Sequence, residues 1–138
     1  MTLRQETLDA FQATSLILVF VTVFFNIKYP LIIENLNLKI PEGKKARQNL
    51  KDKMKTDLII NNLPTMILNG GSFYLFFPLT IKTIKTTNFE IFNFNILSTA
   101  FLFIEFWIGI FFIWSAILLV KTIIKIKSIN IEDSDLIN

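Results

Sequence analysis

The sequence predicts an all-α integral membrane protein whose three transmembrane helices form one domain over residues 1–138. Apolar residues make up 52% of the chain, and they are gathered in three blocks instead of recurring at the spacing of an amphipathic soluble helix. Each block is long enough for a helix to cross the ~30 Å hydrocarbon core of a bilayer, which takes about 20 residues. We therefore expect an integral protein of the plasma (inner) membrane.

The first span is expected over residues 10–27, which carry no charged side chain. It ends at Lys28-Tyr29-Pro30, where the lysine and the tyrosine suit the headgroup region and the proline is expected to kink the helix. The polar residues of this span share one side of the helix, which we expect to face the other spans. They are Gln12, Ser15, Thr22 and Asn26.

Residues 34–57 form a charged connector. Pro41-Glu42-Gly43 predicts a turn. The apolar residues that follow it recur every four positions among basic ones, which indicates a short basic amphipathic helix lying on the membrane surface. Four cations of this helix are expected to bind anionic lipid headgroups, or else a cytoplasmic regulator or another anionic ligand: Lys44, Lys45, Arg47 and Lys51. No phosphate-binding glycine motif accompanies them, so no specific nucleic-acid partner is expected.

The second span is expected over residues 58–81, again without a charged side chain. Pro64, Gly70 and Gly71 are expected to kink or interrupt its helix and to act as a gating hinge. The polar residues of this span also share one side and are candidates for the lining of a pore. They are Asn61, Thr65, Asn69 and Ser72.

The third span is expected over residues 96–120 and contains one charged residue, Glu105. An ionisable group at this depth costs at least ~2.5 kcal/mol, so it points to a function. Ser98 and Gly109 share its stripe and complete the candidate pore lining. Glu105 could take part in conduction or proton coupling, act as a neutral hydrogen-bond donor with a structural role, or dock a partner. The large aromatic residues off this stripe are expected to face lipid: Phe103, Trp107, Phe111 and Trp114.

The distribution of lysine and arginine predicts the orientation of the spans. The first connector, Lys28 and the C-terminal tail hold eleven of the fourteen basic residues, and the remaining three are Arg4, Lys82 and Lys85. Three spans place these two groups on opposite sides of the membrane. Because basic residues favour the cytoplasmic side, the N-terminus is expected outside and the C-terminus in the cytoplasm.

The chain contains neither histidine nor cysteine. This excludes disulfides, zinc sites built on these residues, and catalysis by Ser-His or Cys-His pairs. The acids outside the spans form no paired spacing that fits a reaction. We therefore expect no enzyme, no cofactor and no metal site.

Three polar stripes on three consecutive spans predict a shared interior, and the expected function is a small oligomeric membrane pore or ion channel. Three helices cannot easily enclose water alone, so a cyclic homo-oligomer is expected, with Glu105 forming an acidic ring that favours cations. In size, span number and orientation the chain is similar to phage holins and to small membrane effectors of bacterial defence systems. The basic connector is a place where a cytoplasmic signal could act, so gating from the cytoplasmic side is expected to be possible.

The alternative is a non-conducting accessory or scaffold subunit of a larger membrane complex. Small and polar side chains ordinarily hold membrane helices together, so the stripes could serve packing within the chain or contacts with other subunits. In that case Glu105 would pair with a lysine or arginine of a partner.

Overall fold

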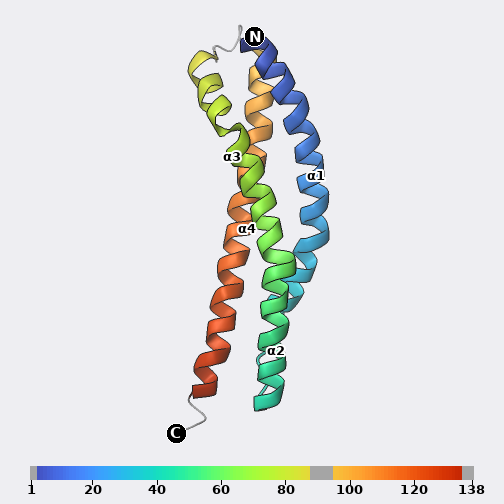
Figure 1. Ribbon diagram of the computed structural model, residues 1–138, viewed down its shortest axis with the longest axis vertical. Helices are drawn as coiled ribbons and strands as arrows, with labels where there is room; N and C mark the ends of the chain where they lie inside the picture. Colours follow the sequence, from blue (N-terminus) through green and yellow to red (C-terminus); the bar gives the residue numbers. More distant parts are fainter. Residues whose placement is uncertain (1–2, 88–94, 135–138) are drawn as a thin grey trace.

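The computed structural model describes residues 3–87 and 95–134, and in these ranges the chain forms helices and no strand (Figure 1). The all-α class is thus confirmed. The helices are α1 (Leu3–Asn37), α2 (Lys44–Asp57), the π-helical segment η1 (Leu58–Asn62), α3 (Leu63–Thr86) and α4 (Ile96–Ser134).

The helices form an elongated bundle in which the chain runs along the long axis three times. In Figure 1, α1 descends from the N-terminus, α2, η1 and α3 climb back, and α4 descends again toward the C-terminus. Helices α1 and α4 are therefore parallel to each other and antiparallel to α3. All three long helices pack against one another.

Two of the described helices contain stretches that are long and apolar enough to cross a membrane. They lie in Gln5–Asn37 and Ile96–Ile129. The second expected span, 58–81, is not among them, because amide, glycine and proline residues lower its hydropathy. At 1.5 Å per residue, the 39 residues of α4 measure about 58 Å, more than the ~40–45 Å of a whole bilayer. If α4 crosses a bilayer, one of its ends therefore extends into water.

The basic helix of the first connector forms as α2, but it does not lie across the bundle. The residues that follow α2 and η1, Leu58 and Leu63, both keep right-handed helical dihedral angles, so α2 continues through η1 into α3. The apolar side of α2 is buried, since Leu50 and Met54 pack with Ile129 of α4. This packing corrects the expected placement on the membrane surface.

The sequence predicts a kinked or interrupted second span, and no interruption occurs at its two glycines. Helix α3 runs without a break through Gly70 and Gly71. Pro64 lies at the start of α3, directly after the π-helical turn. Proline has no N–H for the bond to the preceding turn, and a π-helical turn accommodates such a local loss of the regular bonding pattern. Pro30 likewise lies inside α1, which continues to Asn37.

Candidate functional site

Glu105 points into the bundle of a single copy. Its side chain is 1% exposed, and neither carboxylate oxygen has a hydrogen-bond partner among the described residues. Phe101 and Ile108, one turn away on either side along α4, are fully buried on the same face. An ionised carboxylate without partners in such a site costs several kcal/mol, so the neutral acid is the form that suits this packing.

Glu105 shares its side of α4 with Gly109 and Phe112, which pack against α3. Helix α1 packs against the neighbouring side of α4. The rings of Phe25 and Phe111 lie 5.2 Å apart, which sets the register between the parallel helices α1 and α4. By that register Glu105 lies at the level between Thr14 and Val21, and both of these residues are fully buried. The Thr14 hydroxyl donates to the carbonyl of Ala10 at 2.7 Å, so its hydrogen is used within α1.

Glycine residues let α3 and α4 approach closely one to two turns of α4 beyond Glu105. A Cβ atom on Gly70 would lie 2.8 Å from the Phe112 ring, and one on Gly109 would lie 3.1 Å from the Phe73 ring. On each helix a glycine thus leaves room for an aromatic ring of the other helix. The two rings stack with their centroids 6.2 Å apart. Gly70 therefore has a packing role, and its use as a hinge stays a prediction.

An amide group joins α3 to α4 one turn further along. The Asn69 side-chain nitrogen donates to the Ser115 hydroxyl at 2.5 Å and to the Phe111 carbonyl at 3.3 Å. Asn69 is fully buried, and its side-chain oxygen has no partner among the described residues. The interior is therefore polar on both sides of the level formed by Val21 and Ile108.

A network around Asp57 links three helices at the π-helical turn. Asp57 is 5% exposed and accepts hydrogen bonds from the side chains of Asn61 at 2.6 Å and Asn62 at 3.1 Å. The oxygen of Asn61 accepts one from Lys28 of α1 at 2.9 Å. The Thr122 hydroxyl of α4 shares its hydrogen between the Leu118 carbonyl at 3.0 Å and the oxygen of Asn62 at 3.4 Å. Each oxygen of the buried carboxylate thus accepts a hydrogen bond.

The other predicted lining residues of the second and third spans also lie inside one copy. Thr65 and Ser98 are buried, and Ser72 is partly buried. The hydroxyls of Thr65 and Ser72 donate to the carbonyls of Asn61 and Leu68 four residues earlier in the helix. Thr65, Ser98, Glu105 and Asn69 are therefore buried within one copy, whereas Ser72 stays partly exposed. The role of all five in a pore stays a prediction.

The expected inward stripe of the first span is wrong. Gln12 and Asn26 are exposed on the outside of the bundle, and Ser15 and Thr22 are only partly buried. The buried side of α1 is formed by Thr7, Ala10, Thr14, Val21, Phe25, Ile32 and Asn35. Small and aromatic side chains thus decide which side of α1 packs. Phe111, expected to face lipid, packs against this side as well.

The predicted anion-binding cations differ in their availability. Lys44 and Lys45 are exposed, and Lys51 is partly buried. The Arg47 side chain instead donates from Nε to the Pro41 carbonyl at 2.7 Å, which holds the turn before α2 in place. Contact of these four cations, Lys44, Lys45, Arg47 and Lys51, with anionic headgroups stays a prediction.

A lysine of α4 caps the C-terminus of α1. The Lys125 ammonium donates to the carbonyl oxygens of Asn35 at 3.2 Å, Leu36 at 2.6 Å and Leu38. These carbonyls lie at the C-terminus of α1, where helical hydrogen bonds run out and the helix dipole favours a cation.

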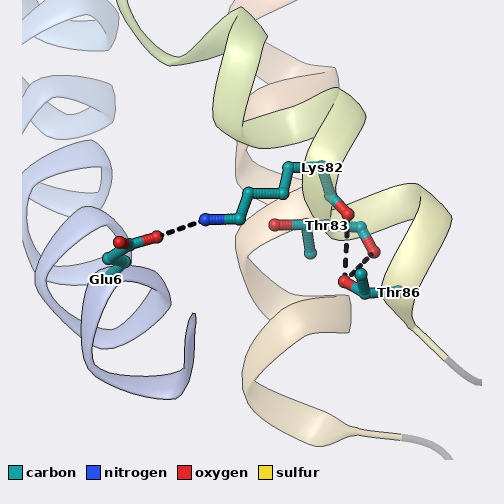
Figure 2. A network of polar contacts seen from close by, with 4 residues as sticks. All are labelled: Glu6, Lys82, Thr83 and Thr86. Carbon is teal, nitrogen blue, oxygen red and sulfur yellow. Dashed lines mark hydrogen bonds and ion pairs between the residues drawn. The ribbon is translucent and has the colours of Figure 1, made fainter. Parts of the chain in front are cut away.

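An ion pair ties α1 to α3 at the opposite end. The Lys82 ammonium lies 2.7 Å from a carboxylate oxygen of Glu6 (Figure 2). Through this hydrogen bond and its charge, Lys82 holds the pKa of Glu6 below its ordinary value. Thr83 points into the bundle nearby, where its buried hydroxyl has no partner among the described residues.

Sequence reasoning missed several polar residues of the interior. The fully or nearly fully buried positions Phe101, Ile108, Ser115, Thr122 and Ile129 recur every seven residues along α4. A seven-residue repeat marks the packed seam of a helical bundle and would have found Ser115 and Thr122. The sequence indicates the Asp57 network only weakly, through a carboxylate that is followed four and five residues later by amides.

Comparison with protein-family models, curated proteins and solved structures found no match for the chain.

Proposed function

We propose that the chain is a three-pass membrane protein that conducts protons or small cations through the interior of its own bundle. The observation that carries the proposal is Glu105, a fully buried carboxyl group without a hydrogen-bond partner among the described residues, inside an apolar stretch. Leaving such a group unpaired costs about 1–3 kcal/mol in folding. A buried ionisable group that costs this much and makes no stabilising hydrogen bond is typical of a group that exchanges a proton or binds an ion.

The arrangement of the helices supports a third span. Helices α1 and α4 run parallel and side by side, and both contain a stretch that can cross a bilayer. A chain that crosses twice in the same direction must return between the two crossings. Helix α3 packs along both and runs the other way, so it is the return pass. The distribution of lysine and arginine then places the N-terminus outside and the C-terminus on the cytoplasmic side of the inner membrane.

The pathway we propose has two polar sections and one apolar barrier. Glu105 belongs to the outer section, and Asn69 with Ser115 begins the inner one. Between them lies the level of Val21 and Ile108, both fully buried. An apolar constriction of this kind blocks ions by excluding water. Sliding of α3 against α4 at the glycine contacts would widen it.

This route replaces a water-filled pore between copies with a narrow path inside each copy. Three helices cannot easily enclose a wide water-filled opening, so the path we propose stays dry at Val21 and Ile108 until α3 slides against α4. Glu105, Thr65, Asn69 and Ser98 turn toward the axis of their own bundle, so a ring of copies could not expose them to a central opening without turning the helices. Assembly of several copies is still proposed, but the pathway does not depend on it.

The test is flux through purified protein in liposomes. A membrane potential drives protons into vesicles that contain a pH-sensitive dye, and a second set reports potassium flux. We expect flux with the wild type and a loss of at least tenfold with Glu105→Gln. Trp107→Phe, a change on an exposed side of the same helix, serves as the matched control and should conduct normally. Equal flux in wild type and Glu105→Gln would remove Glu105 from the mechanism.

The accessory-subunit alternative keeps one supporting observation, the exposed amides Gln12 and Asn26 on the outside of α1. The expected pairing of Glu105 with a cation of a partner is disfavoured by its burial within one copy. A purified protein that conducts neither protons nor potassium, in any variant, would favour this alternative.

A further inference from the structure

The outward side of α1 carries amide groups where it should meet lipid. Gln12 and Asn26 are both exposed, and both lie in the charge-free stretch 10–27. In the apolar stretches 10–27, 63–81 and 96–120, they are the only exposed asparagine or glutamine residues. An amide without a hydrogen-bond partner in hydrocarbon costs several kcal/mol. Gln12 and Asn26 lie near the two ends of this stretch. A protein surface that supplies hydrogen-bond partners for their amides removes this cost, so such a surface is favoured over lipid on this side.

The amides belong to a regular stripe. Gln12, Val19 and Asn26 are spaced by seven residues, and Leu16 and Val23 repeat at the same interval between them. The three apolar members are exposed by 73% (Leu16), 62% (Val19) and 54% (Val23). Alternating intervals of four and three residues form the seam of a two-stranded coiled coil. We call these five residues the α1 stripe.

We infer that the α1 stripe binds the α1 stripe of a second copy in a parallel, symmetric dimer. Insertion gives every copy the same orientation, so two α1 helices in contact run parallel. A two-fold axis along the membrane normal then places each residue opposite its own counterpart. An amide both donates and accepts, so Gln12 can pair with Gln12 and Asn26 with Asn26. A single polar residue at a seam position also fixes the register of two helices.

The dimer contact is independent of the conduction pathway. The α1 stripe lies on the side of α1 opposite Thr14 and Val21, which are buried in the interior of the bundle. The inference rests on the proposed membrane placement of α1 but not on conduction. Loss of dimers with normal flux, or loss of flux with normal dimers, would separate the two proposals.

Cysteine cross-linking tests the contact directly, because the chain has no cysteine of its own. Single variants Leu16→Cys, Val19→Cys and Val23→Cys in membranes are oxidised with copper phenanthroline in air. We expect disulfide-linked dimers in high yield. Phe20→Cys and Ile27→Cys are matched controls, since these residues are equally exposed on α1, at 60% and 59%, but lie outside the stripe. Their yield should be at least about fivefold lower.

An equal yield at stripe and control positions, or a peak at the controls, would overturn the inference. A second measurement removes the amides. Gln12→Leu combined with Asn26→Leu should weaken dimerisation about three- to thirtyfold for each amide pair, measured by energy transfer at decreasing protein-to-lipid ratio. Ile113→Leu with Val120→Leu on the exposed side of α4 is the control. Unchanged dimerisation of a variant with a normal helical circular dichroism spectrum would also overturn it.

Discussion

Replacing Gly70 with alanine tests the closest contact between α3 and α4. The new Cβ atom would lie 2.8 Å from Cε2 and 3.0 Å from Cδ2 of Phe112, so the ring must move. That movement disturbs its stacking on Phe73. Overpacking of this kind costs ~1–3 kcal/mol, whereas alanine improves helix propensity over glycine by ~1 kcal/mol. We expect Gly70→Ala to lower the free energy of unfolding by about 0–2 kcal/mol.

The neighbouring glycine provides the control. A Cβ atom on Gly71 would meet no atom within 4 Å, so Gly71→Ala gains helix propensity without a clash. The difference in unfolding free energy between the two variants isolates the clash, and it should be ~1–3 kcal/mol. The assay is denaturant unfolding in detergent micelles, followed by circular dichroism. Phe112→Leu in the Gly70→Ala background should reduce the difference. Equal stability of the two alanine variants would refute the close approach.

Three further predictions concern the polar contacts. Asp57→Ala leaves the amides of Asn61 and Asn62 without their acceptor and should lower the unfolding free energy by about 2–4 kcal/mol, again measured by unfolding in micelles. Lys125→Met removes the donor to the last carbonyls of α1 and should cost about 1–2 kcal/mol; amide hydrogen exchange near Asn35 should speed up, and unchanged exchange would contradict the capping role. The pair of Glu6 and Lys82 stabilises only while Glu6 is charged, so its contribution is present at neutral pH and disappears as the pH falls below the ordinary carboxyl pKa of 4.5. Because the pair is exposed, Lys82→Ala should have a small effect at low salt and none at high salt, in pH-dependent unfolding of both proteins.

The helical class and the approximate positions of the apolar stretches could be predicted because hydropathy and charge act locally along the chain. The ends of the helices could not, because charged residues mark where lipid ends and not where a helix ends. The first expected span covers residues 10–27, whereas α1 runs from Leu3 to Asn37. Its extension beyond Ile27 is stabilised by Lys125 and by packing on Leu118, contacts between segments far apart in the sequence.

The side of each helix that packs was predictable only in part. The polar sides of the second and third spans include Thr65, Asn69 and Glu105, which do turn inward. For α1 the side with Gln12 and Asn26 points outward. In a membrane, lipid and protein interior would be equally apolar, so close packing and not polarity would decide which side makes the contact. The pairing of Asn69 with Ser115, 46 residues apart, depends on the register of two antiparallel helices, which composition alone does not fix.

The dependence of flux on protein density tests most directly whether ions pass inside one bundle. Liposomes are prepared over a range of low protein-to-lipid ratios, and proton flux per chain is measured with Glu105→Gln as the background. A pathway within each copy predicts a flux per chain that stays constant as the density falls. A flux per chain that drops steeply on dilution would show that several copies must surround the pathway, and it would contradict the account.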